Sequence, residues 1–259
     1  MSYYTKFAPL IISGSKVDAA TKLYFDAYST QPPDAYKEVV NSMVVGMKNL
    51  SIWARRDLFY FLDSHSQQGS RINLMTPGTD TLVDIGSGSS WVQYQGRTAS
   101  SGNALRSVTN IDDLTNISLN DACFGGWWNT STSTNAYDMG HVTGNRLRFN
   151  NRAVTSKLWL LNQTSGSSIS TAESSIGHWH VQRTADDDVE LFKNGASFSA
   201  LTTSSSSMPS EPFSIGSAVG QYSDRQIRLA YMGAAIPGLE DEFYDLLAAY
   251  VAGVAALAA

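Results

Sequence analysis

The chain has 259 residues, of which 42% are hydrophobic and only 16% are charged. The charged fraction is below the ~25% usual in globular domains, and Ser, Thr, Asn and Gly fill the gap, which favours many short strands joined by polar turns over a large helical protein. The net charge of −5 argues against a nucleic-acid partner, because nucleic-acid binding requires clustered Lys and Arg.

The single cysteine, Cys123, excludes an intrachain disulfide and indicates synthesis in a reducing compartment. Residues 1–30 show no basic stretch followed by an apolar run and a cleavage site, so we expect no signal peptide. The most apolar stretch, 246–259, is shorter than the ~20 residues of a membrane-spanning helix. We therefore expect no membrane insertion.

The first predicted elements are helical. Pro32-Pro33-Asp34 resembles a helix start, and apolar residues between 39 and 47 recur at helical spacing. The segment 51–60 predicts a second, short helix with Trp53, Asp57 and Tyr60 on one side. These helices are expected to cover one edge or end of the rest of the fold.

From Arg71 onward, short apolar or alternating runs are separated by turn residues at the roughly 8–12-residue spacing of a sandwich or barrel. Asn194-Gly195 can take the positive φ values of a type I′ turn, which predicts a hairpin. A terminal helix is predicted after Pro237-Gly238, where acidic residues precede an apolar stripe. The predicted strands are 82–85, 91–95, 104–108, 123–128, 146–149, 158–161, 178–183, 189–193, 196–201 and 227–233.

Five local patterns, taken in order, resemble the concanavalin A-like (laminin-G-like) jelly rolls of bacteriophage and prophage virion proteins. They are Ile52-Trp53 with Asp57-Leu58-Phe59-Tyr60; Ile72-Asn73-Leu74 with Pro77-Gly78; the run from Asn120 to Trp127; Leu191-Phe192-Lys193-Asn194-Gly195; and Leu229 to Gly233 followed by Leu239 and Tyr244. The resemblance covers the chain from Ile52 to its C-terminus, and the order of the patterns carries it.

The expected fold is mainly β: a two-sheet antiparallel jelly-roll sandwich with N-terminal helices and a C-terminal helix. Residues 1–68 are expected to form an N-terminal extension and helical segment for attachment or oligomerisation. Residues 69–236 are expected to form the sandwich, and residues 237–259 a helix that packs on the sandwich or on a partner.

The resemblance implies a non-enzymatic virion structural protein (a fibre, head decoration or tail appendage) that is made in the host cytoplasm. Its expected partners are other virion subunits, further copies of itself in a homo-oligomer, and glycans on the host surface. The apolar stretches 7–12 and 246–257 are the expected subunit contacts. A free carbohydrate-binding lectin and a glycoside hydrolase are the alternatives.

A glycoside hydrolase needs two carboxylates about 5–5.5 Å apart for retention or about 6.5–9.5 Å apart for inversion. Hydrolases with the concanavalin A-like fold usually carry a Glu-x-Asp-x-x-Glu strand. The predicted sandwich of this chain instead has three widely separated glutamates, Glu173, Glu190 and Glu211. We therefore expect no catalytic residues and no enzyme activity.

Aromatic and amide side chains are the candidates for carbohydrate binding. Trp127, Trp128 and Tyr137 can stack on pyranose rings, and Asn129 can bond their hydroxyls. Adjacent strand residues face opposite ways, so at most one of the two tryptophans is expected to be buried, with the other exposed or covering a helix. Core packing is the alternative role for each ring.

Two further segments carry metal-ligating side chains. His178 and His180 lie on one face of a predicted strand, where they can bind zinc; the alternative is a polar pair on a solvated face with Trp179 in the core. The run Asp186-Asp187-Asp188, and less clearly Asp112-Asp113, can bind calcium or simply form a solvated turn. We expect no required cofactor, although calcium binding is possible.

Cys123 falls within an apolar predicted strand. The sequence shows no basic neighbour that would stabilise its thiolate. We therefore expect a small core residue and not a nucleophile.

Overall fold

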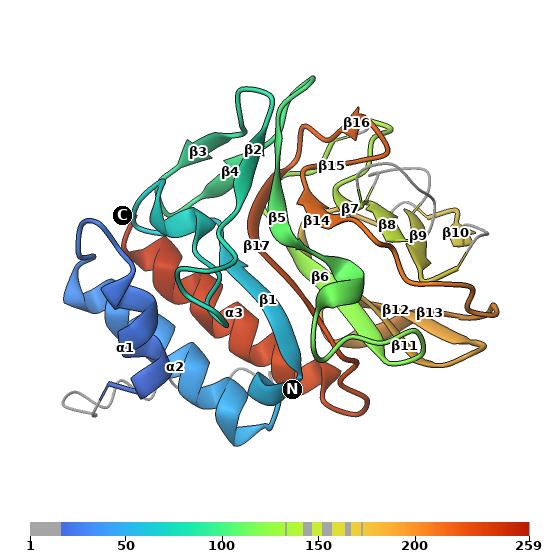
Figure 1. The fold of residues 1–259 in the computed structure, drawn as a ribbon, viewed down its shortest axis with the longest axis horizontal. Helices are drawn as coiled ribbons and strands as arrows, with labels where there is room; N and C mark the ends of the chain where they lie inside the picture. The colour runs from blue at the N-terminus through green and yellow to red at the C-terminus, as the bar shows by residue number, and fades with distance from the viewer. Residues whose placement is uncertain are drawn as a thin grey trace.

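The computed structural model describes residues 17–132, 134–141, 147–151, 157–163, 167–171 and 173–258. Within these ranges two antiparallel sheets pack face to face, and three α-helices cover the outer face of one of them (Figure 1). The predicted sandwich with N-terminal helices and a C-terminal helix is therefore confirmed.

The described elements follow a helix–sandwich–helix order. The α-helices are α1 (Ala19–Asp26), α2 (Asp34–Asn49) and α3 (Glu240–Ala256), and short 3-10 helices span Trp53–Arg55 (η1), Gly69–Arg71 (η2) and Ile111–Asp113 (η3). The strands are β1 (Arg56–Phe61), β2 (Val83–Ile85), β3 (Ser90–Val92), β4 (Gly96–Thr98), β5 (Ala104–Asn110), β6 (Ala122–Trp128), β7 (Met139–His141), β8 (Leu147–Asn150), β9 (Lys157–Leu161), β10 (Ser167–Ile169), β11 (Gly177–Ala185), β12 (Asp188–Lys193), β13 (Ala196–Thr202), β14 (Pro212–Ile215), β15 (Ser217–Ala218), β16 (Gln221–Tyr222) and β17 (Gln226–Gly233).

The sheets place strands from distant parts of the chain side by side. Sheet A has the order β13-β12-β11-β6-β17-β4-β3, and β1 also pairs with β17. Sheet B has the order β10-β9-β8-β7-β14-β5-β2, and β15 and β16 form a separate small hairpin. Sheet A thus takes one strand, β1, from the chain before residue 69.

The core between the sheets is built around large aromatic side chains. Trp128 and Trp179 from sheet A and Trp159 from sheet B are completely buried there. Phe149 of β8 meets Trp128 edge-on, with ring centroids 5.4 Å apart. Such offset or edge-on contacts are the arrangement that aromatic quadrupoles favour.

A second core lies between sheet A and the helices. Phe61 of β1 stacks on Tyr250 of α3 at a centroid distance of 4.3 Å, and Phe59 stacks on Tyr231 of β17 at 5.8 Å. The apolar stripe predicted for the terminal helix is confirmed by the burial of Phe243, Leu247 and Tyr250. No helix in the described part of the chain is long and apolar enough to cross a membrane.

A buried ion pair links α3 to the sandwich. Asp63 accepts a hydrogen bond from Arg228 Nε at 2.8 Å and another from the Tyr250 hydroxyl at 2.7 Å. Burial raises the pKa of Asp63 to about 6, against the opposing effect of Arg228. Removing either partner would leave a buried polar group unpaired, so the contact ties the helix to one place on the sheet.

The prediction of a second helix over 51–60 is wrong. After the short η1 the chain enters strand β1, whose residues are all buried. Leu58 and Tyr60 point into the core between the sheets, whereas Phe59 and Phe61 point toward the helices. Because both faces of the strand are covered, its sequence does not alternate between apolar and polar residues. The periodicity of such a short apolar run does not distinguish a strand from a helix.

The hairpin around Asn194-Gly195 is confirmed. Asn194 has a φ of 51° and Gly195 a φ of 82°, as a type I′ turn requires, and they join β12 to β13. The longer predicted strands are also present, with ends shifted by a few residues. The pattern of the sequence does not predict the short strands β4, β7, β10, β14, β15 and β16.

A glycine in the central strand allows a close approach between the sheets. A Cβ at Gly126 would lie 2.5 Å from Cε of Met139 and 2.6 Å from the carbonyl oxygen of Leu229. We expect Gly126→Ala to lower the free energy of unfolding by about 2 kcal/mol through overpacking. Urea denaturation measures this, with Thr202→Ala on exposed edge strand β13 as a control that should stay within about 0.5 kcal/mol. Equal stability of the two variants would contradict the packing of β6.

Candidate functional site

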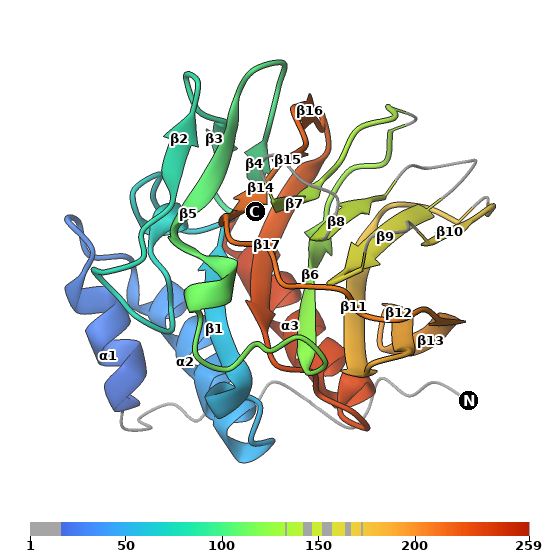
Figure 2. The same ribbon diagram turned by 45° about the vertical axis from the view of Figure 1, so that its right-hand side comes forward.

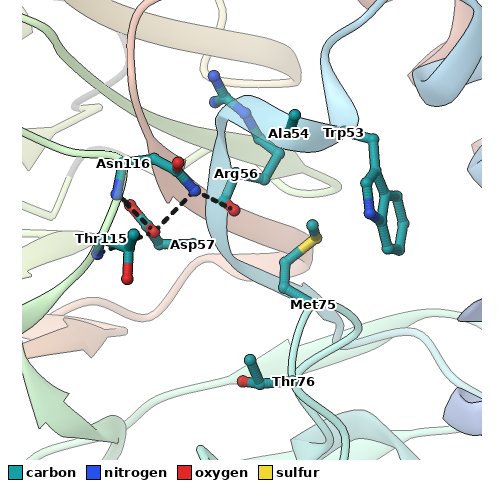
Figure 3. A pocket seen from close by; sticks show the side chains of 8 residues that line it. All are labelled: Trp53, Ala54, Arg56, Asp57, Met75, Thr76, Thr115 and Asn116. Atoms are coloured by element: carbon teal, nitrogen blue, oxygen red, sulfur yellow. Dashed lines mark hydrogen bonds between the residues drawn. The ribbon is translucent and has the colours of Figure 1, made fainter.

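A hollow of about 290 Å³ opens where the helical layer meets the sandwich. It lies between η1, the start of β1, the loop after η2 and the loop after η3 (Figure 3). Its lining residues are Trp53, Ala54, Arg56, Asp57, Met75, Thr76, Thr115 and Asn116.

The hollow has one apolar side and one polar side. Figure 3 shows Trp53 and Asn116 on opposite sides, with Met75 between them. The Trp53 side chain is half-buried, and Lys48 Nζ lies 5.1 Å from the centroid of its ring. The indole is thus held by a cation–π contact while part of its surface remains accessible.

Asp57 fixes the polar side of the hollow. Its carboxylate accepts hydrogen bonds from the backbone N–H groups of Thr115 (3.1 Å), Asn116 (2.9 Å) and Ile117 (3.0 Å), and from Nδ2 of Asn116 (3.0 Å). Because these donors occupy both of its oxygens, the carboxylate acts as a clamp on the loop. The side-chain amide of Asn116 also donates, through Nδ2, to the carbonyl oxygen of Arg56 at 3.0 Å.

Asn73 fixes the opposite rim in a similar way. Its Oδ1 accepts from the backbone N–H groups of Phe59 at 2.9 Å and Met75 at 3.1 Å. Its Nδ2 donates to the carbonyl oxygen of Asp57 at 3.1 Å and to Thr76 Oγ1 at 2.9 Å. Buried polar side chains therefore hold both rims of the hollow in place, which is the preorganisation that a binding site needs.

Sequence reasoning did not identify this hollow. The sequence predicts Trp53 on the face of a helix, and it gives Asn73 no role beyond its place in a local pattern. The available signal was Asp57, a carboxylate inside an otherwise apolar buried run, since a buried polar group must find several hydrogen-bond partners. Which loop supplies those partners depends on the fold.

The two tryptophans proposed for sugar stacking face opposite ways, as expected. Trp128 is completely buried between the sheets, so its ring offers no face to a ligand. Trp127 is half-buried and packs on α3, where its ring is parallel to that of Tyr244 at a centroid distance of 5.9 Å. One ring is therefore core and the other covers a helix, and sugar stacking by the half-buried Trp127 stays a prediction.

Tyr137 and Asn129 lie at the opposite end of β6 from the hollow, roughly 20 Å away along a seven-residue strand. Tyr137 is half-buried, with the Arg148 guanidinium 4.8 Å from its ring centroid. Asn129 Nδ2 donates to Gln226 Oε1 at 2.7 Å. The structure therefore brings these two residues to one end of the sandwich but keeps them apart from the hollow.

The expectation that His178 and His180 lie on a solvated face is wrong, because α3 covers that face of sheet A. Each is only 1% exposed, and both approach the Tyr231 hydroxyl, from Nε2 of His178 at 2.6 Å and from Nδ1 of His180 at 2.8 Å. Burial lowers the pKa of His178 well below its usual value and that of His180 to about 3. Among the described residues, no three His, Cys, Asp or Glu side chains are placed to hold a metal ion.

Two of the acids in the aspartate run, and the three glutamates, contact other side chains. Asp186 accepts from the hydroxyl and backbone N–H of Ser205, and Asp188 accepts from the Thr184 hydroxyl; all of Asp186, Asp187 and Asp188 are exposed. The glutamates considered for hydrolysis contact different groups: Glu173 contacts Lys193, Glu190 contacts Ser197 and Glu211 contacts His141. A calcium site in the aspartate run stays a prediction.

Cys123 is a buried core residue, as predicted, but it does have a basic neighbour. Arg56 Nη1 lies 2.6 Å from its sulfur, and the thiol donates to the carbonyl oxygen of Ala234 at 3.2 Å. Burial raises the pKa of the Cys123 thiol, with Arg56 acting in the opposite direction. The arginine was not foreseen because it comes from β1, the segment predicted as a helix.

No family model and no curated protein matches the chain. Similar solved structures include the ligand-binding domain of botulinum neurotoxin serotype D in complex with N-acetylneuraminic acid (TM-score 0.54, 12% identity, 78% of this chain and 52% of that chain). The binding domain of serotype C1 is also similar (TM-score 0.54, 12% identity, 75% of this chain and 53% of that chain).

A third similar structure belongs to a study in which cell entry of botulinum neurotoxin type C depends on interaction with two ganglioside molecules (TM-score 0.53, 14% identity, 77% of this chain and 53% of that chain). The chain thus spans about half the length of the structures it matches. At these identities the likeness shows the fold, a two-sheet β-sandwich.

The clamp on the hollow can be tested by removing the Asp57 carboxylate. We expect Asp57→Ala to leave several backbone N–H groups unpaired and to lower the free energy of unfolding by about 2–3 kcal/mol. Hydrogen exchange in the loop at residues 115–117 should accelerate as well. Asp112→Ala, which removes an exposed acid from neighbouring η3, is the control. Unchanged loop exchange in Asp57→Ala would show that the carboxylate does not hold the hollow.

Proposed function

We propose that this chain is a lectin-like, non-catalytic carbohydrate-binding module, and that the hollow beside Trp53 holds a sugar ring. The observation that carries the proposal is the pairing of an indole and a thioether on one side with amide and hydroxyl groups on the other. A pyranose has the matching asymmetry, because one face presents C–H groups while its edge presents hydroxyls.

The size and rigidity of the hollow suit a single sugar ring. Its volume of about 290 Å³ is close to the lower end of the ~300–1,000 Å³ usual for small-molecule pockets. Trp53 and Met75 would contact the apolar face of the ring, and Asn116 and Thr115 would face its hydroxyls. Since Asp57 and Asn73 already order both rims, little conformational entropy would be lost on binding.

The neighbouring folds support a glycan ligand only in general terms. Two of them are named for binding N-acetylneuraminic acid or for interaction with gangliosides. The similarity covers about half of each neighbour, so those names do not say which half of the protein holds the ligand. The chemistry of this chain's own hollow therefore carries the proposal.

The absence of catalysis is part of the proposal. Glu173, Glu190 and Glu211 each contact a different residue, and a hydrolase would require two carboxyl groups facing one cleft. Their arrangement therefore favours binding without bond cleavage.

The finer part of the proposal is that the module belongs to a phage-type virion, where it would assemble with other subunits and with copies of itself. This part rests on the order of the sequence patterns from Ile52 onward. Of the two apolar stretches expected to contact subunits, 7–12 lies outside the described residues. The other, 246–257, buries Leu247 and Val254 within the chain's own helical layer.

The end of the sandwich with Tyr137 and Asn129 is a second candidate surface for the glycan. The Tyr137 ring is half-buried. The next residue, buried Asp138, accepts a hydrogen bond from Arg225 Nη1 at 3.0 Å. This support is less specific than that for the hollow, but separate substitutions at the two places can distinguish them.

A glycan array followed by calorimetric titration of the strongest ligand tests the function. We expect the wild-type protein to retain glycans, and Trp53→Ala to weaken binding about tenfold or more through the loss of about 1.4 kcal/mol of stacking. Tyr137→Ala should bind as the wild type does, and circular dichroism should show that both variants fold.

The outcomes separate the function from the site. A wild-type protein that retains no glycan at millimolar concentrations would refute carbohydrate binding. Binding that survives Trp53→Ala but is lost in Tyr137→Ala would keep the function and move the site to the other end of β6.

A further inference from the structure

Helix α3 lies across the outer face of sheet A, over strands from both halves of the chain (Figure 2). Between the helix and the sheet lie His178, His180 and Tyr231, here called the imidazole cluster. His178 meets Phe243 edge-on at 6.1 Å and stacks on Tyr244 at 6.1 Å, and both rings belong to α3. The cluster is therefore a direct contact between the helix and the sandwich.

All the hydrogen bonds within the cluster can be made with both imidazoles neutral. Gln182 Oε1 accepts from the backbone N–H of Ile236 and also lies 3.3 Å from His180 Nε2, so this nitrogen carries a proton and the other nitrogen of His180 accepts from the Tyr231 hydroxyl. The hydroxyl oxygen then accepts from His178 Nε2. That leaves His178 Nδ1 as a buried nitrogen with no hydrogen-bond partner.

An added proton has no acceptor at either histidine. On His178 it would create a buried N–H at the unpartnered nitrogen. On His180 it would make Nδ1 a donor to the Tyr231 oxygen, so that the Tyr231 hydroxyl would donate to His178 Nε2 and His178 would carry its own proton on the unpartnered Nδ1. In both cases a buried charge would lack compensation, which is among the most costly changes in a protein interior.

The groups around the cluster do not offset such a charge. From β1, Arg56 places its guanidinium 5.8 Å from the Tyr231 ring and 5.9 Å from the Phe243 ring. From β6 comes the buried Cys123 thiol, and from β12 the Phe192 ring, 5.6 Å from His180.

From α3, Glu240 is bound by Gln182 Nε2 at 2.5 Å. The other acids of its first turns, Asp241, Glu242 and Asp245, are exposed. The nearest charge on the sheet side is thus the like charge of Arg56.

We propose that the imidazole cluster is an acid-sensitive contact that holds α3 on sheet A at neutral pH and releases the helix under mildly acidic conditions while the sandwich stays folded. The sandwich can persist because its own core, around Trp128, Trp159 and Trp179, lies on the other face of sheet A and contains no residue of α3.

The direction of the pH effect follows from proton binding. Burial keeps the pKa of both docked histidines well below that of the released state, where an imidazole returns to about 6.5. Below about pH 6.5 the released state takes up two protons that the docked state excludes, so each histidine disfavours docking by up to about tenfold per pH unit.

Asp63 acts in the opposite direction. It contacts Tyr250 of α3, and burial raises its pKa from 3.8 to about 6. Between these values the docked state binds a proton that a solvated Asp63 would not, which favours docking by up to about tenfold per pH unit. With two imidazoles against one carboxyl, the net loss of docking is about tenfold per pH unit between about pH 6 and about pH 4.

Hydrogen exchange followed by mass spectrometry at about pH 7 and about pH 5, corrected for intrinsic rates, tests the proposal. Peptides from α3 should lose protection about tenfold per pH unit, while peptides from β9 in sheet B keep theirs. Fluorescence of Trp127, which stacks on Tyr244 of α3, should change over the same range.

The control variants separate the cluster from other acid effects. The double variant His178→Gln and His180→Gln should lose the acid response of α3, and His65→Gln, which leaves the cluster intact, should retain it. An unchanged response in the double variant would overturn the proposal. If the double variant does not fold, the wild-type comparison still decides, because equal loss of protection in α3 and β9 would mean global unfolding and not release of the helix.

Discussion

The outer face of sheet A carries Phe59, Phe61, Leu229 and Tyr231, and burying these side chains is the constraint that positions the helices on the sandwich at neutral pH. Each large apolar side chain left exposed to water would lose about 1.5–3 kcal/mol of the hydrophobic free energy that its burial contributes to folding. The helical layer is therefore part of the fold, and sheet A has a core on each of its faces.

Covering sheet A on both sides forces polar groups into the interior, and the structure gives each a specific set of partners. Asp63 is bound by Arg228 and by Tyr250 of α3, and Asp57 is bound by the loop after η3. These contacts join segments distant in the sequence. Because an unpaired buried polar group is costly, they fix the position of the helices and loops more sharply than apolar packing can.

The hollow and the imidazole cluster both arise at the seam between helices and sandwich, and β1 connects them. The backbone of Arg56 lines the hollow, while its guanidinium reaches Cys123 and the Tyr231 ring beneath α3. The hollow and the imidazole cluster, which are the two candidate functional features, therefore lie where the two layers meet. Of the two adjacent tryptophans, Trp128 fills the inner core and Trp127 packs on Tyr244 of α3.

The amino-acid sequence by itself determined the features that depend on neighbouring residues. The Asn194-Gly195 turn, helix α2, the closing helix and the longer strands follow from local periodicity and turn chemistry, and so does the opposite orientation of Trp127 and Trp128. Only the tertiary structure decided that β1 is a strand, that His178 and His180 are buried, and that Trp53 faces Asn116 across a hollow. Each of these depends on what covers a surface, and the covering segment is far away in the chain: α3 in the case of the histidines, and the loops that Asp57 and Asn73 hold in the case of the hollow.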